Sequence, residues 1–364
     1  MLELNRLTAA LVCLTAAAAA CSCGDDTTST GGGGSSPTSS SSSTGGAGST
    51  GGTGGTGGDS PGGSGGGVPC LENEGTVFAL TQLTFGEGTN GQWRAIGRNL
   101  DGLESDENST DVCQPNAGGT ASVAYPDGDD GIDNSFGKNM LPVILSLSTQ
   151  WPTAVNNSLD QGNFNAMLKA YCLPDSGDAQ ITTKVFGGAD LGAIPMFDGT
   201  DVWPVAPELL GDLSDPESST LVFENSSVTA DVFDSGPDES FILTIPITYN
   251  DQTASLKLTL HSAQLTMDLS NDRKSATGGV LGGVLNTEEL VDQVKKVAFM
   301  ADICEDASYP AILQTIRQMS DIMTDGTQDP SQTCDGISFG VHFEMVEVQL
   351  GNVALPAPVG MACP

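Results

Sequence analysis

The sequence predicts a mainly β, α+β protein in which β-sandwich-like antiparallel sheets carry a packed αα-hairpin. Three observations predict it. Stretches rich in Val, Thr, Ile and Phe alternate apolar with polar residues, as half-buried strands do. Gly, Asp, Asn and Pro separate these stretches at short intervals. Two segments in the last quarter of the chain change to the spacing of apolar residues that is typical of helices.

Alternation predicts most of the strands. Phe164–Cys172 has apolar residues at every second position, although the helical spacing of Phe164, Leu168 and Tyr171 competes with that interpretation. The segments 241–249 and 254–269 are expected to form a hairpin around Asn250 and Asp251. The remaining expected strands are 76–85, 180–186, 221–233 and 337–350.

One strand is expected to be irregular. In the segment 254–269 the apolar face shifts by one residue after Leu260. A shift of one residue moves side chains to the other face of a sheet unless an extra residue is inserted. The pattern therefore predicts a β-bulge near His261 and Ser262.

The helices of the αα-hairpin are predicted at 287–303 and 308–323. Asn286 or Thr287 is the expected N-cap of the first and Ser308 of the second. A further helix is expected over 135–147, where a proline inside the segment disturbs it.

Residues 1–20 are predicted to be a lipoprotein signal peptide. The uncharged Ala- and Leu-rich run 7–20 is shorter than the roughly 20 residues that span a bilayer. Small residues lead directly into Cys21, as in a bacterial lipobox, so we expect a diacylglycerol on the Cys21 thiol. Cys23 is a rival lipidation site, and cleavage that releases a free secreted protein is the alternative to both.

Residues 21–67 are predicted to be a disordered tether, and residues 68–364 a globular domain. The tether is rich in Gly, Ser and Thr and cannot build a core. A flexible chain of this kind spans roughly 35–40 Å on average. We therefore expect the folded domain outside the cytoplasm, lipid-anchored at a bacterial cell envelope, with the outer membrane as the expected site.

The cysteines predict a disulfide framework. Of nine cysteines, Cys13 leaves with the signal and Cys21 and Cys23 belong to the anchor, which leaves six. An even number in an exported domain predicts three disulfides, and the sequence leaves their pairing open. The six residues are Cys70, Cys113, Cys172, Cys304, Cys334 and Cys363.

The charge balance limits the partners. The chain has 46 acidic and 12 basic residues and a net charge of -34. Such a chain is repelled by a phosphate backbone, which excludes nucleic acid as a partner. It attracts cations, although solubility alone also accounts for the acidity. The expected partners are the bilayer, through the acyl anchor, and an extracellular or envelope component that the sequence does not identify.

One loop has the composition of a calcium site. The segment Tyr125–Asn134 places carboxylates at alternate positions separated by glycine, as a turning loop does when it binds a hard cation. Asp127, Asp129 and Asp133 are the predicted ligands, with Asp101 as a further one if the fold brings it near. Calcium is the one cofactor that the sequence predicts. The alternative is a solvated acidic turn, for which Asp and Gly are ordinary residues.

Two other patterns have the form of a catalytic or a sugar-binding motif. Gly336–Gly340 matches the Gly-x-Ser-x-Gly nucleophile elbow, but the alternation after it favours the start of a strand. The segment Asp198–Trp203 could present its tryptophan to a sugar, although tryptophan more often anchors a core or a loop. We therefore assign no catalytic residue.

Several short strings resemble one group of proteins. They are the lipobox with its tether and the segments Asn99–Gly102, Asp130–Gly137, Asp201–Trp203 and Cys334–Ser338. Together they resemble envelope lipoproteins of the type that myxobacteria encode in quantity. The resemblance implies a bacterial lipoprotein and no particular activity.

The sequence as a whole predicts a surface-exposed, lipid-anchored envelope protein. We expect its domain to be a non-catalytic binding or structural module, stabilised by calcium if the acidic loop binds it. The alternative is a secreted hydrolase of envelope or prey polymers that uses Asp or Glu residues.

Overall fold

A computed structural model describes residues 75–364 except 89–90, 148, 238, 250–251 and 357–359. The predicted signal peptide, the lipidation sites Cys21 and Cys23, the tether and Cys70 lie outside the described residues. Within the described ranges, no helix is long and apolar enough to cross a membrane.

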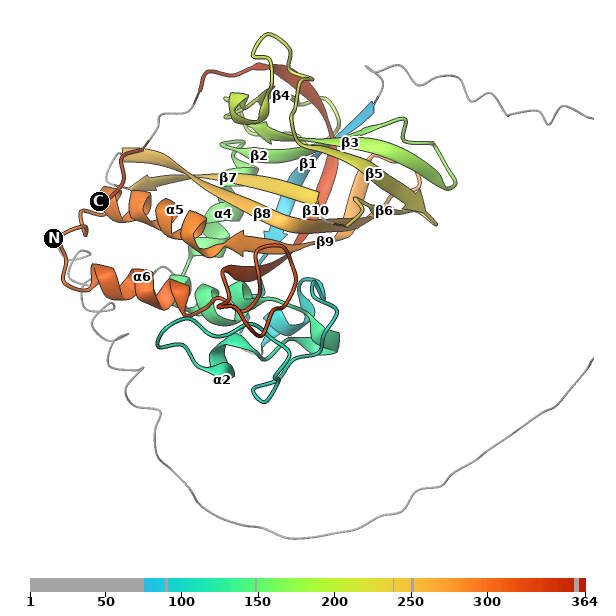
Figure 1. Cartoon of the computed structure of the whole chain (residues 1–364). Coiled ribbons are helices and arrows are strands. Elements are labelled where there is room, and N and C mark those ends of the chain that lie inside the picture. The colour runs from blue at the N-terminus through green and yellow to red at the C-terminus, as the bar shows by residue number, and fades with distance from the viewer. Residues whose placement is uncertain (1–74, 89–90, 148, 238, 250–251, 357–359) are drawn as a thin grey trace, which may run out of the picture.

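The described residues form one large sheet, which confirms the mainly β, α+β class (Figure 1). The chain of pairings β1-β2-β3-β5-β6-β8-β9-β10 returns to β1, and every neighbouring pair in it is antiparallel. β4 lies parallel to β10, and β7 forms a hairpin arm on β8. The strands are β1 (Gly75–Thr84), β2 (Asn165–Tyr171), β3 (Ala179–Gly188), β4 (Val202–Val205), β5 (Val222–Thr229), β6 (Val232–Asp234), β7 (Glu239–Tyr249), β8 (Gln252–Leu269), β9 (Ser275–Asn286) and β10 (Gly336–Val353).

The predicted αα-hairpin is present and covers one flank of the sheet. In Figure 1 its two helices, drawn in orange, lie side by side. Asn286 is the N-cap of the first helix, because its side chain accepts hydrogen bonds from the N–H groups of Glu288 and Glu289. The helices are α2 (Ala121–Ala124), α3 (Leu141–Leu147), α4 (Trp151–Asp160), α5 (Thr287–Met300) and α6 (Tyr309–Arg317), with short helical segments η1 (Gln92–Ala95), η2 (Asp129–Gly131), η3 (Phe136–Met140) and η4 (Pro207–Leu209).

Both faces of the sheet bury apolar residues where β1, β2 and β3 meet. In β1, Phe78 and Leu80 belong to the main core, whereas Val77 and Ala79 belong to a smaller core on the opposite face. Burial on both faces explains why β2 has no exposed residue. The strand interpretation of this segment is confirmed, and the competing helical one is wrong.

Several expected boundaries differ from the structure; the first helix of the αα-hairpin, expected over 287–303, ends at Met300. The segment 221–233 holds two strands, because Ala230 and Asp231 have φ angles of 49° and 67° and turn the chain between them. The second helix of the αα-hairpin ends at Arg317, not at 323, because the backbone N–H of Asp321 turns to the carbonyl of Gly336. The expected helix over 135–147 is present: η3, a π-helical turn, continues directly into α3, so the disturbance expected from the proline is a widened turn just before it.

Two glycines allow a loop to lie flat on the sheet. A Cβ atom on Gly340 would lie 2.3 Å from the carbonyl oxygen of Ile96 and 2.6 Å from Cα of Gly97. A Cβ atom on Gly282 would lie 2.6 Å from Cγ of Arg98. Segment 96–98 thus touches β9 and β10, and it sets the position of the acidic loops that follow it.

Disulfides join the loops to the sheet and the helices. Cys113 pairs with Cys334, and Cys304 pairs with Cys363. Cys172 is also disulfide-bonded. The disulfide framework predicted for an exported domain is confirmed for these residues.

Candidate functional site

Four aspartates from separate segments interact beside β10. Asp101, Asp127 and Asp133 come from the loops that precede η3, and Asp321 comes from the segment after α6. Asp133 Oδ2 accepts a hydrogen bond of 2.6 Å from the Leu100 N–H. The structure thus brings together three of the four residues that the sequence named and adds Asp321, which it did not.

Burial and mutual repulsion keep protons on this cluster. Burial, together with the charges of Asp101, Asp321 and Asp127, raises the pKa of Asp133 to about 9. Burial also raises the pKa of Asp127 and that of Asp321, each to about 7. The Lys138 ammonium opposes the last two shifts. At neutral pH Asp133 is therefore a neutral hydrogen-bonding group in the metal-free protein.

Asp129 does not join the cluster. Its carboxylate forms an exposed ion pair with Arg94, with Nε and Oδ1 2.9 Å apart. Among the described residues, no group of three or more His, Cys, Asp or Glu side chains has an arrangement that could hold a metal ion. Calcium binding by Asp127, Asp129 and Asp133, with Asp101, therefore stays a prediction from the sequence.

The calcium hypothesis has a direct test. A bound ion stabilises the folded state by about 2.7 kcal/mol at a hundredfold excess over its dissociation constant. The hypothesis predicts that Ca²⁺ added to chelator-treated protein raises the unfolding midpoint and that Asp133→Asn removes the response. An unchanged midpoint over a wide range of Ca²⁺ concentrations would leave the loop as a hydrogen-bonded turn.

The Gly-x-Ser-x-Gly string is structural. Gly336–Gly340 lies within β10, as the strand interpretation expects. Ser338 is fully buried; its hydroxyl donates to Asp321 and accepts a 2.7 Å hydrogen bond from the Ser135 N–H. This serine joins the acidic cluster to the sheet and is inaccessible to a substrate.

The tryptophan of the segment Asp198–Trp203 is not a sugar platform. Trp203 is fully buried in the smaller core, stacks on Phe197, and donates its Nε1–H to the Ala189 carbonyl at 2.7 Å. Its alternative role as an anchor is the correct one.

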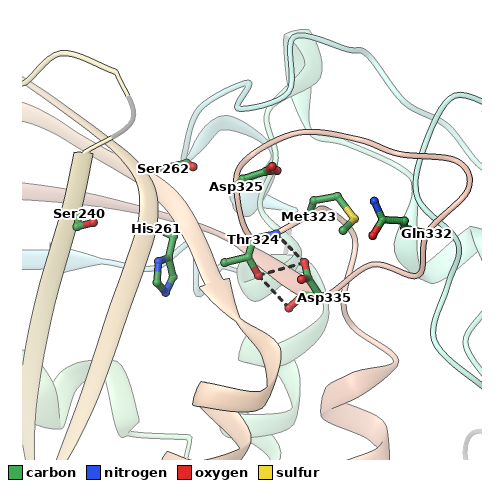
Figure 2. A pocket seen from close by; sticks show the side chains of 8 residues that line it. All are labelled: Ser240, His261, Ser262, Met323, Thr324, Asp325, Gln332 and Asp335. Atoms are coloured by element: carbon green, nitrogen blue, oxygen red, sulfur yellow. Dashed lines mark hydrogen bonds between the residues drawn. The ribbon is translucent and has the colours of Figure 1, made fainter.

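A polar pocket of about 480 Å³ opens where β8 faces the loop 323–335 (Figure 2). Figure 2 shows Ser240 and His261 on the strand side, and Met323, Gln332 and Asp335 on the loop opposite. The lining residues are Ser240, His261 and Ser262 on the strands and Met323, Thr324, Asp325, Gln332 and Asp335 on the loop.

The predicted β-bulge forms the strand wall of this pocket. The register places Ser240 of β7 opposite both His261 and Ser262 of β8, so two residues stand against one. Ser262 has a φ angle of 45°, which costs a residue other than glycine of order 1–3 kcal/mol. His261 Nε2 lies 3.3 Å from Glu289 Oε2 at the start of α5. Bulges and strained residues of this kind are retained where they direct side chains toward a site.

Hydrogen bonds fix the loop wall. Asp335 Oδ1 accepts from the Thr324 N–H at 2.7 Å and from its hydroxyl at 3.1 Å (Figure 2). The same hydroxyl accepts from Nδ2 of Asn286, the N-cap of α5, at 3.0 Å. The Asp335 carbonyl accepts from the Thr287 N–H at 2.9 Å. The loop is thereby held against the helix before any ligand arrives.

The Cys113–Cys334 disulfide connects the pocket loop to the acidic loops. The Cys334 N–H donates to the Gln114 carbonyl at 2.9 Å, so the two chains also pair through their backbones. Gln328 Nε2 donates to Asp101 Oδ2 at 2.8 Å. The pocket and the acidic cluster therefore share one framework.

Sequence patterns pointed to only part of this site. The phase shift in β8 located His261 and Ser262, which line the pocket. Nothing local marked Asp321 or Asp335, because each acquires its role from partners on other segments. Such pairings are absent from any periodicity or motif.

Comparison with known proteins does not indicate a function for this site. No protein family, no curated protein and no solved structure matches this chain. Its function is therefore argued from its own residues.

Proposed function

We propose that this protein is a surface-exposed, lipid-anchored envelope protein whose folded domain is a non-catalytic binding module. The pocket between the β8 bulge and the loop 323–335 is its ligand site. The observation that carries the proposal is the bulge, where Ser262 is held at a positive φ angle in the pocket wall. Strain of this kind persists where the surrounding structure enforces it, and it clusters at ligand-binding and active sites.

The geometry of the wall supports binding by a preorganised surface. Its loop is fixed by a disulfide, by backbone pairing with another loop and by the capping network of α5. A rigid wall loses little conformational entropy when a ligand binds, so more of the interaction energy appears as affinity.

The hydrolase alternative rests on the two carboxylates of the pocket. Paired acids need a separation of about 5–10 Å across a scissile bond. Asp325 and Asp335 both line the pocket and are exposed to solvent. Turnover of an envelope polymer that Asp335→Asn abolishes would favour this alternative over the binding module.

Blocking the pocket tests the proposal. Ser240 is exposed at the pocket rim, so Ser240→Trp is expected to fill the opening without disturbing the core. We expect binding of the purified full-length protein to isolated cell-envelope fractions to fall at least tenfold. Thr229→Trp, on an exposed position of β5, is the matched control and should bind as the unmodified protein does. Equal binding by both variants would remove the pocket from the proposal.

The lipid anchor is tested separately. If Cys21 carries the diacylglycerol, Cys21→Ala is expected to abolish incorporation of a labelled fatty acid and to release the protein into the soluble fraction. Cys23→Ala should keep both the label and the membrane association. The reverse pattern would assign the anchor to Cys23, and no label in the unmodified protein would support a free secreted protein.

A further inference from the structure

We infer that the ligand of the pocket is a neutral, hydroxyl-rich chain, such as the end of an oligosaccharide. The inference rests on the proposed function and names the chemical class of its ligand. It is carried by the mixture of hydrogen-bonding groups in the two walls.

The lining offers donors and acceptors side by side. The side chains of Ser240, Ser262 and Thr324 are hydroxyls, Gln332 carries an amide, and His261 carries an imidazole. A sugar hydroxyl both donates and accepts, so it matches such a surface at several points. Met323 is the only apolar side chain among the lining residues, which leaves an apolar ligand little to pack against.

The pocket carboxylates are oriented acceptors. Asp325 Oδ1 accepts from the Thr327 N–H at 3.1 Å and from its hydroxyl. Asp335 Oδ1 is held in the same way by Thr324. Each carboxylate is thus fixed through one oxygen. Fixed carboxylates accept strong, charge-assisted hydrogen bonds from donors such as vicinal hydroxyls.

The charge of the pocket lining favours a neutral ligand over an anionic or a cationic one. The lining residues include two carboxylates and no Lys or Arg, and the whole chain carries a net charge of -34. An anionic ligand would be repelled. A cationic ligand would find carboxylates that are open to solvent, where an ion pair contributes little.

The open shape of the pocket favours the end or one edge of a chain over a small molecule that is enclosed on all sides. The pocket is bounded by the bulge on one side and the loop on the other (Figure 2). An envelope offers polymers of this kind in large amounts, so weak contacts to one chain end could be multiplied by many copies of the protein.

The test compares four probes of three charge classes on the full-length protein by calorimetry. Cellotetraose and chitotetraose are the neutral probes, spermine the cationic one, and a heparin fragment the anionic one. We expect saturable binding of at least one neutral probe that changes less than twofold between low and high salt. Ser240→Trp and Gln332→Leu should each weaken it at least fivefold, and Thr229→Trp should leave it unchanged.

The outcomes separate this inference from the proposed function. Binding of spermine or heparin alone, sensitive to Ser240→Trp, would overturn the ligand class and keep the pocket as a binding site. Neutral-probe binding that Ser240→Trp does not alter would place the sugar elsewhere and overturn the inference. No binding of any probe would also overturn it, while the assay with envelope fractions decides whether the pocket binds at all.

Discussion

Replacing Gly340 with valine is expected to destabilise the folded domain by about 3 kcal/mol or more. The Cβ atom would lie 2.3 Å from the carbonyl oxygen of Ile96 and 2.6 Å from Cα of Gly97. Both are backbone atoms, which cannot rotate away as the end of a side chain can. Segment 96–98 would have to lift off the sheet and carry the acidic loops with it. Urea unfolding followed by circular dichroism measures the effect.

A matched control isolates the contact. Gly211 lies in a loop where an added Cβ would be 3.4 Å from Cγ2 of Thr220, an ordinary van der Waals distance. Gly211→Ala is therefore expected to change the free energy of unfolding by less than about 0.5 kcal/mol. If Gly340→Val were as stable as this control, segment 96–98 would not rest on the sheet as described.

Asp133→Asn is expected to stabilise the metal-free domain at alkaline pH, by about 2 kcal/mol or more near pH 8. The pKa of Asp133 is about 9 in the folded protein, chiefly through burial, against about 4 in an unfolded chain. A carboxyl group with the higher pKa in the folded state takes up a proton on folding. Its stabilising contribution is complete below the unfolded pKa and is lost as the pH rises through the folded value.

The free energy of unfolding measured as a function of pH shows directly whether ionisation of Asp133 destabilises the fold. With excess chelator, the stability of the unmodified protein should fall between about pH 4 and pH 9, by roughly 1.4 kcal/mol per pH unit for each proton involved. Asparagine has nothing to ionise, so the variant should show a shallower fall. Asp129→Asn is the control, because that side chain is exposed and paired with Arg94. A variant less stable than the unmodified protein at pH 8 would show that the charged form of Asp133 is the one the fold needs.

Local sequence patterns predict the strands that have one apolar and one polar face. β8 is the clearest case, since a shift in its apolar face located the bulge to the residue. Capping chemistry similarly identified Asn286 as one of two candidate caps of α5. In both cases the information lies within a few residues of the feature that it determines.

β9 was missed for the opposite reason. Its glycines interrupt the alternation that predicts the other strands. These positions need glycine because residues distant in the sequence pack closely against them. A Cβ on Gly279 would lie 2.5 Å from the ring of Phe343, and one on Gly282 would meet Arg98. The acidic cluster shows the same limit, because Asp321 joins Asp133 only through the tertiary fold.

The sheet closes on itself because β10 pairs with β1, and this closure affects how the chain folds. β1, the first described strand, pairs along its length with β10, the last, and the two are separated by most of the domain. Pairings between distant segments carry a large loop-closure entropy and slow folding. Until the ribosome has delivered Gly336–Val353, neither β1 nor β9 has its partner on that side. The closed set of pairings therefore cannot form until β10 has been synthesised.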